Sequence, residues 1–187
     1  KPSLNDGRPA ILDGVGIEQH PGEPLPLDVP FTDETGAAVT LDRYFGSRPV
    51  VLSLVYYRCP MLCTQVLNGS VSSLKGMNLE AGKDFDLLTI SFNPEESAEM
   101  AAAKKKAYVD MTGRPETGAN WHFLTGSPES IKRVADAVGF TYRYDETTQQ
   151  YAHASGITIL TPEGVISRYL FGVEYAPRDL RLALVEA

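Results

Sequence analysis

The chain has only two cysteines and three histidines among its 187 residues. Two cysteines are too few for the disulfide framework that holds small secreted domains together, and a chain of this length buries a core that needs none. No apolar run is longer than an ordinary strand, so the sequence predicts no membrane-spanning helix. Basic residues are also scarce, with 17 Lys and Arg against 24 Asp and Glu. The formal net charge of -7 argues against nucleic acid as a partner.

The chain begins at Lys1 rather than at a methionine, which is consistent with a processed form that has lost a signal or anchor segment. Residues 1–27 are rich in proline and glycine, and we expect an extended arm with little regular structure there. Hydrophobic content of 43% and charged content of 22% are ordinary for a soluble globular protein. We therefore expect a single folded domain over residues 28–187.

Strand and helix patterns alternate after the arm. Residues 29–41 predict a small β-hairpin, and the nearly continuous apolar run 50–55 is typical of a strand buried on both faces. Further strands are expected at 85–92, 121–124, 157–160 and 165–171, with helices after Pro60 and at 95–108, 128–138 and 177–185. This order predicts an α/β, thioredoxin-like fold: a central mixed sheet flanked by helices, with an added N-terminal β-hairpin.

Both cysteines lie where the strand 50–55 gives way to a helix, in Cys59-Pro60-Met61-Leu62-Cys63. A helix N-terminus favours the thiolate, so we expect reactive thiols. Residues four apart on a helix have Cβ atoms roughly 5–6 Å apart, whereas a disulfide wants about 3.5–4.5 Å. Two thiolates on one metal ion tolerate the wider gap. The C-x-x-x-C spacing therefore favours a metal, although a disulfide stays open because Cys59 is expected at the cap of the helix.

A third ligand has to come from elsewhere, and histidine is the commonest partner. We expect His20, in the arm, to be solvated, and His122, inside the strand 121–124, to be packed and hydrogen-bonded. His153 stands just before the strand expected at 157–160. In a thioredoxin-like fold that loop faces the N-terminus of the first helix, so His153 is the candidate.

The set Cys59, Cys63 and His153 combines soft thiolates with a borderline imidazole. Such a set suits copper or zinc. A structural zinc site normally has four protein ligands. Three ligands at an exposed junction better suit a metal that is held and then passed on.

These segments resemble the Sco/SenC family of copper-binding, thioredoxin-like proteins. The resemblance covers roughly residues 28–187. It rests on the Cys59–Cys63 segment, on His153 nine residues before Pro162, and on the stretches 91–95 and 124–129. It implies copper, as Cu(I) or Cu(II), bound by Cys59, Cys63 and His153, and a role in assembling the dinuclear copper centre of cytochrome c oxidase. It also implies a monomer in the bacterial periplasm or cell envelope, anchored to the membrane, whose partner is the copper-site subunit of the oxidase or another copper or thiol protein.

The chain departs from the family pattern around the site. Thr64 follows the second cysteine where the family often has proline, and Asn93 replaces an aspartate. Ala152 precedes the histidine where an aspartate is common, which removes a possible support for the imidazole. Met61 stands where the family often has an acidic residue, and we interpret it as an exposed apolar contact for a docking partner rather than as a thioether ligand.

A copper metallochaperone, which is not an enzyme, is the leading hypothesis. The alternative is a thiol-disulfide oxidoreductase that reduces the cysteines of a copper-accepting target, with Cys59 as attacker and Cys63 as resolver. A peroxide-reducing enzyme would need a threonine and an arginine around one reactive cysteine, and Arg58 lacks the upstream threonine. The remaining hypothesis is that the two cysteines have only a structural role. Arg58 and Lys75 are expected to be surface charges.

Overall fold

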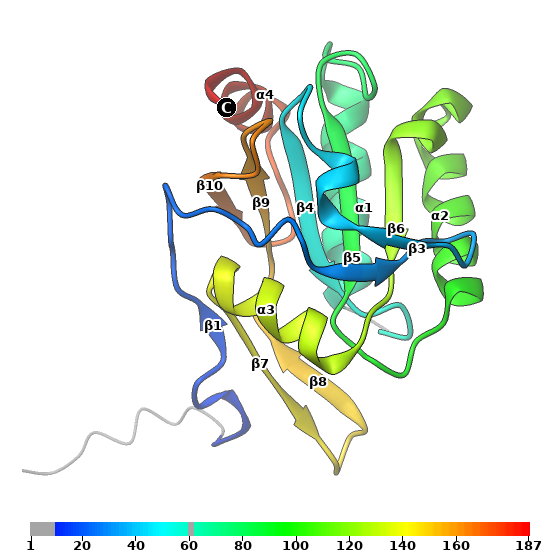
Figure 1. Ribbon diagram of the computed structural model, residues 1–187. Helices are drawn as coiled ribbons and strands as arrows, with labels where there is room; N and C mark the ends of the chain where they lie inside the picture. Colours follow the sequence, from blue (N-terminus) through cyan, green and yellow to red (C-terminus); the bar gives the residue numbers. More distant parts are fainter. Residues whose placement is uncertain (1–9, 60–61) are drawn as a thin grey trace, which may run out of the picture.

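The computed structural model describes residues 10–59 and 62–187, and for residues 62 and 63 it describes the backbone alone (Figure 1). The strands are β1 (Gly16–Ile17), β2 (Pro30–Thr32), β3 (Ala38–Thr40), β4 (Val50–Val55), β5 (Asp86–Ser91), β6 (Trp121–Leu124), β7 (Phe140–Asp145), β8 (Gln150–His153), β9 (Gly156–Leu160) and β10 (Ile166–Phe171). The helices are α1 (Leu62–Gly76), α2 (Ala98–Thr112), α3 (Pro128–Val138) and α4 (Pro177–Glu186), with short 3-10 turns η1 (Ala10–Leu12), η2 (Leu41–Tyr44) and η3 (Pro115–Asn120).

The central sheet has the strand order β10-β9-β4-β5-β6. β4, β5 and β6 run parallel, β9 lies antiparallel to β4, and β10 lies antiparallel to β9. This is the mixed sheet that the alternation of strands and helices predicts. The carboxyl ends of the parallel strands meet at one edge, so the segments that follow β4 and β5 come together there.

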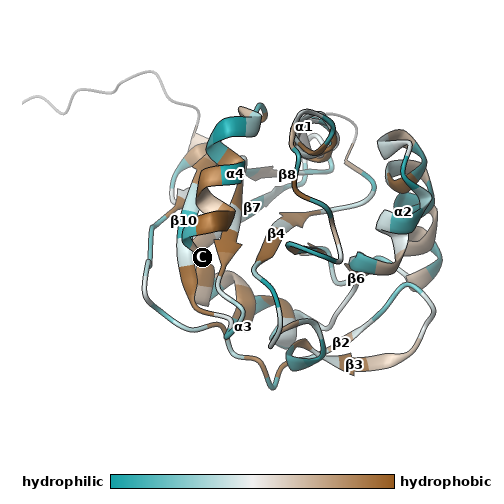
Figure 2. Cartoon of the chain, turned by 90° about the horizontal axis from the view of Figure 1, so that it is seen from above, coloured by the Kyte–Doolittle hydropathy of each residue, from teal (hydrophilic) through white to brown (hydrophobic). Residues whose placement is uncertain are grey.

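Helices cover both faces of this sheet. Figure 2 shows α1, α2 and α4 on one side of the hydrophobic strands and α3 on the other. α1 packs against α2 and α4, and α4 packs against β10. The side chains of β4 are buried almost throughout, as the apolar run predicts. The sheet is therefore a rigid platform for the residues at its ends.

α3 begins and ends where its sequence signals place it. The hydroxyl of Ser127 accepts the N–H of Ser130, and Gly139 takes the left-handed conformation at the C-cap with φ of 79°. The expected start of the preceding helix at residue 95 is wrong. α2 begins at Ala98, because Ser97 provides the cap and accepts the N–H of Met100.

The sequence patterns did not predict the second, smaller sheet, which has the order β1-β7-β8. β7 and β8 form an antiparallel hairpin that projects below the central sheet in Figure 1, beside α3. β1, within the arm, pairs with the start of β7 through Gly16 and Ile17. Residues expected to form a loop before β9 thus form a strand that ends at His153.

The hairpin of β2 and β3 covers the edge of the central sheet. Thr32 exchanges two backbone hydrogen bonds with Thr125, just past β6. Glu34, in the hairpin turn, accepts the Phe123 N–H of β6 at 3.0 Å and pairs with Lys105 of α2 at 2.6 Å. Covering an edge strand in this way hides backbone groups that could otherwise pair with another chain.

The Glu34 carboxylate has an unusual pKa as a result. Burial on its own would raise this pKa, but the contacts with His122, Lys105 and the Phe123 N–H outweigh burial and lower the pKa to about 2. The carboxylate therefore stays charged at any pH well above 2. Its contribution to stability is complete above the pKa of an unfolded glutamate, near 4.5, and is lost as the pH falls toward 2.

Glu34→Gln is expected to lower the free energy of unfolding at pH 7 by about 2 kcal/mol, because the charged pairing is lost and Lys105 is left half-buried. Urea unfolding of both proteins should show this difference shrinking between about pH 5 and pH 2. Glu163→Gln, at an exposed turn, serves as the control and should change stability little at any pH. A pH-independent difference for Glu34→Gln would contradict the assignment.

Candidate functional site

Cys59 ends a tight turn that follows β4. Its N–H donates to the carbonyl of Tyr56 at 3.2 Å and closes the turn Tyr56–Cys59. The Cys59 side chain is buried, at 8% exposure. The first cysteine thus lies in a defined turn at the carboxyl edge of the sheet, ahead of the helix.

A buried carboxylate holds this turn. Glu96, which is 6% exposed, accepts the N–H of Tyr57 at 2.6 Å and the N–H of Arg58 at 2.9 Å, one on each oxygen. The Ser91 hydroxyl donates to the same carboxylate at 2.5 Å. Hydrogen bonds to a charged acceptor are about twice as strong as neutral ones. Glu96 therefore joins the segment after β5 to the segment that carries Cys59, a role that the sequence patterns did not reveal.

The side chain of Tyr57 anchors the turn to the central sheet. Its hydroxyl donates to the Leu124 carbonyl at 2.7 Å, at the end of β6. Burial, with the negative charges of Glu96 and Glu34, raises the pKa of Tyr57 well above its ordinary value. The hydroxyl therefore stays protonated and keeps donating.

The second cysteine lies in the first turn of α1, which begins at Leu62. The side chain of Cys63 falls outside the described part of the chain, as do Pro60 and Met61, so the expectations for the helix-start proline and for the methionine contact stay predictions. Cys59 precedes the described start of α1. The distance between the two sulfurs depends on the Cys63 side chain, so the preference of the C-x-x-x-C spacing for a metal over a disulfide stays a prediction.

Thr64 has a visible role at this junction. Its hydroxyl donates to the Cys59 carbonyl at 3.2 Å, and its own carbonyl accepts from the Tyr108 hydroxyl at 3.3 Å. The residue that replaces the family's proline thus ties the cysteine turn to α1, and α2 in turn supports it. Asn93, which stands where the family has an aspartate, likewise stabilises a turn, because its side-chain oxygen accepts the Glu95 N–H at 3.0 Å.

His153 is the last residue of β8 and is buried, at 8% exposure. Its imidazole lies among aromatic rings, with centroid distances of 5.3 Å to Phe92, 6.0 Å to Phe140 and 6.1 Å to Tyr56. Its Nδ1 lies 2.7 Å from the Ala154 carbonyl oxygen. When Nδ1–H donates to that carbonyl, the lone pair of the neutral ring is on Nε2, as a metal ligand requires.

Tyr56 connects His153 with the cysteine turn. Its ring meets the imidazole edge-on, and its carbonyl accepts the Cys59 N–H. The structure therefore brings the turn that carries Cys59 next to His153, although the two come from different sheets. Ala152 pairs with Arg143 on the opposite face of the hairpin from His153. The carbonyl of Ala154, rather than a carboxylate at position 152, supports the imidazole.

The other histidines are engaged elsewhere. The Nδ1 of His20 lies 3.1 Å from the Ala137 carbonyl oxygen, and its side chain is 31% exposed, so the expectation of a solvated residue is wrong. His122 packs on Tyr44 at 4.7 Å between ring centroids, as expected of a packed histidine. Among the side chains that the structure describes, a set without Cys63, no three histidine, cysteine, aspartate or glutamate residues gather as metal ligands.

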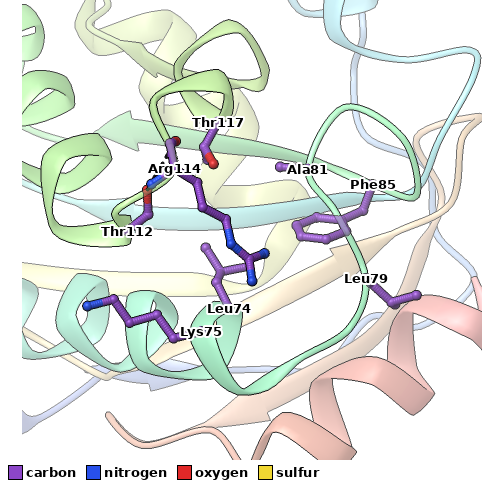
Figure 3. Close-up of a pocket in the computed structure, with 8 residues that line it drawn as sticks. All are labelled: Leu74, Lys75, Leu79, Ala81, Phe85, Thr112, Arg114 and Thr117. Atoms are coloured by element: carbon purple, nitrogen blue, oxygen red, sulfur yellow. Dashed lines mark hydrogen bonds between the residues drawn. The ribbon is translucent and has the colours of Figure 1, made fainter.

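Arg58 and Lys75 are both exposed, as expected for surface charges. Lys75 borders a small pocket between the end of α1 and the end of α2, lined by Leu74, Lys75, Leu79, Ala81, Phe85, Thr112, Arg114 and Thr117 (Figure 3). Its volume of about 10 Å³ is at the lower limit for one water molecule. This pocket also adjoins the amino end of β5, so it is remote from the cysteine turn and offers no competing site.

None of the helices in the described ranges has both the length and the apolar composition needed to span a bilayer.

Glu96→Gln is expected to destabilise the protein by about 2 kcal/mol, because the amide offers only one acceptor oxygen and leaves a buried N–H without its partner. The loosened turn should expose Cys59 and speed its reaction with a small aromatic disulfide several-fold. Urea unfolding and the thiol reaction rate, both measured in a Cys63→Ser background, provide the two readouts.

Glu95→Gln is the matched control, since Glu95 is the exposed neighbour in the same turn. It should leave both readouts close to those of the parent. Equal behaviour of the two variants would show that Glu96 does not hold the turn.

The sequence profile of the SCO1/SenC family matches residues 21–183. Among solved structures, a protein from Aquifex aeolicus VF5 is 24% identical with a TM-score of 0.77, over 88% of this chain and 92% of that chain. ScoI of Arabidopsis thaliana, solved with copper bound, is 20% identical with a TM-score of 0.69, over 89% and 96% of the two chains. BsSco, a member of the Sco family of cytochrome c oxidase assembly proteins with an identified disulfide switch, is 20% identical with a TM-score of 0.65, over 91% and 99%.

A comparison with curated protein sequences gave no match. The solved structures bear out the thioredoxin-like α/β fold. Because the family profile spans most of the chain, this protein belongs to the SCO1/SenC family.

Proposed function

We propose that this protein is a copper metallochaperone that supplies the dinuclear copper centre of cytochrome c oxidase. Cys59 and Cys63 bind copper as thiolates, and His153 completes the site through Nε2. Membership of the SCO1/SenC family supports the proposal, as does the copper bound by Arabidopsis ScoI. The donor set of two soft thiolates and one imidazole fits copper in either oxidation state.

The observation that carries the proposal is the position of His153 beside the cysteine turn. Tyr56 contacts the imidazole with its ring and the Cys59 N–H with its carbonyl. The Nδ1 of His153 lies 2.7 Å from the Ala154 carbonyl oxygen, and in the tautomer in which Nδ1–H donates to this carbonyl, Nε2 carries the lone pair that a metal needs.

Copper is cargo in this scheme and moves by ligand exchange. A thiolate of the target replaces one thiolate of the chaperone at a time, and no electrons are transferred. The cysteines must lose their protons to bind, so loading releases protons and weakens as the pH falls. Oxidation of Cys59 and Cys63 to a disulfide blocks loading, which links metal status to redox status.

The second candidate is a thiol-disulfide oxidoreductase that reduces the target's cysteines. Cys59 lies in the turn Tyr56–Cys59, ahead of the described start of α1, which is where the attacking cysteine is expected, and this position supports the alternative. BsSco, with its disulfide switch, lends further support. Against a general reductase, no peptide bond in the described ranges is cis, whereas thioredoxins use a cis-proline to hold their substrate.

We place the protein in the cell envelope, where an oxidase copper subunit would be its partner. The family resemblance supports this placement and suggests a membrane-anchored monomer.

His153→Ala is expected to weaken copper binding by about 100-fold or more, because the loss of a ligand exceeds the 10–100-fold effect of losing a partner of a ligand. Titration of the reduced protein with Cu(I) and Cu(II), following the thiolate-to-copper absorption band, measures the effect. The parent should bind one copper per chain with this band.

His20→Ala is the control histidine variant and should bind copper as the parent does. Disulfide exchange of the cysteine pair should change little in either variant, which shows that the turn is intact. Unchanged copper affinity in His153→Ala would overturn the three-ligand site. Absent copper binding together with rapid disulfide exchange would favour the oxidoreductase.

A further inference from the structure

A cleft of about 570 Å³ lies beside the candidate site. Tyr56 and Arg58 of the cysteine turn form one wall, and Glu95 lies on the same side. Tyr144, Gln150 and Tyr151 of the β7–β8 hairpin form the other wall. The proposed metallochaperone function does not by itself involve this cleft.

One face of the hairpin is aromatic and leads from His153 into the cleft. Tyr142 pairs with His153 and Tyr144 pairs with Tyr151, so all four side chains are on one face. Tyr151 contacts Tyr56 at 5.2 Å and Tyr144 at 5.1 Å between ring centroids. The inner end of this face is buried at His153, whereas Tyr144 at the outer end is 49% exposed. The cleft therefore connects the surface to the surroundings of the candidate ligands.

The edge of β8 borders the same cleft. The sheet order β1-β7-β8 leaves β8 at one end, and within the described ranges no strand pairs with its outer side. In the central sheet, by contrast, other segments cover the two edge strands. Thr32 covers the β6 end, and the arm covers the start of β10 through the bonds of Gly22 and Glu23 with Ile166. β8 carries neither the proline nor the charge that protects an open edge.

The burial of Cys59 restricts how a partner can reach it. Cys59 is 8% exposed, so an extended segment reaches its thiol more easily than a broad globular surface does. The cleft leads toward this residue, because Tyr56 and Arg58 of the turn that carries Cys59 line it. Tyrosines line both walls of this cleft and Arg58 lines one of them, and both residue types are enriched where proteins bind proteins tightly. An open strand edge binds extended chains through main-chain hydrogen bonds.

We propose that this cleft takes an extended, cysteine-bearing segment of the exchange partner, added as a strand along β8. The inference rests on the exchange chemistry of the proposed function. β8 has four residues and pairs with a segment about 13 Å long. The side chains of that segment pack against Tyr144 and Tyr151, and its cysteine reaches Cys59 at the inner end.

The test uses thiol exchange in a Cys63→Ser background, in which Cys59 is the sole thiol. The probe is a synthetic peptide of about ten residues with a central cysteine, activated as a mixed disulfide with thionitrobenzoate, and flanked by alternating valine and threonine. The Cys59 thiolate attacks the peptide sulfur, a new disulfide joins protein and peptide, and thionitrobenzoate leaves as the measured thiolate. The symmetric thionitrobenzoate disulfide is the small probe that needs no docking.

Tyr144→Ser is expected to slow the peptide reaction about tenfold, equivalent to about 1.4 kcal/mol, and to leave the rate with the small probe unchanged. Phe171→Ser is the matched control, because Phe171 is 51% exposed on β10 at the far edge of the central sheet. A peptide with prolines at alternating positions, which cannot pair along a strand, should also react about tenfold more slowly with the unaltered protein.

Equal peptide rates for the Tyr144 and Phe171 variants, or indifference to the prolines, would overturn the docking proposal. The proline peptide leaves the protein unaltered, so this arm does not depend on the folding of a variant. Copper titration of Tyr144→Ser with both cysteines present is a separate readout. Failure of the unsubstituted protein to bind copper would remove the metallochaperone function and leave the docking result intact.

Discussion

The carboxylate of Glu96 is the contact on which the geometry of the candidate site depends. The N–H groups of Tyr57 and Arg58 lie at the tip of the turn after β4, and both donate to this carboxylate. Buried without an acceptor, each would cost about 1–3 kcal/mol. The Phe92 N–H also donates to the Val55 carbonyl, so the ends of β4 and β5 are joined twice. The position of Cys59 is thus set by a tertiary contact between two strand ends, and the Thr64 hydroxyl of α1 adds a hydrogen bond to the Cys59 carbonyl.

His153, the candidate ligand outside the cysteine turn, is positioned in a different way. His153 lies on a projecting hairpin outside the central sheet, and aromatic packing places it. Phe92 is the common element, because it follows β5 and contacts both His153 and Tyr151. Aromatic pairs of this kind contribute about 0.5–1.5 kcal/mol each beyond their buried area. The hairpin is therefore held against the sheet at its inner end, near the imidazole, while its outer end stays open and lines the cleft.

The sequence predicts the central sheet well because its signals are local. The apolar run of β4 and the caps of α3 each lie within a few residues. The β7–β8 hairpin also has a signal, since Phe140, Tyr142 and Tyr144 alternate with polar residues. Its turn contains no glycine, and Gln149 takes the positive φ of 55° instead, so the usual turn signal is missing. Glu96 has no sequence signal, because its role arises only when two strand ends meet.

Within the proposed function, the burial of Cys59 and His153 and the openness of the cleft together favour transfer over storage. A copper ion held by Cys59 and His153, each 8% exposed, would lose little to water, because few solvent molecules reach the ligands. Release then depends on a competing ligand that is brought to the site. A segment bound along β8 would raise the local concentration of its own thiolate next to Cys59, as any tethered second binding event does. In the proposed function the same approach would also serve exchange with a disulfide. The turn held by Glu96 would then support both chemistries, and the oxidation state of the cysteine pair would decide between them.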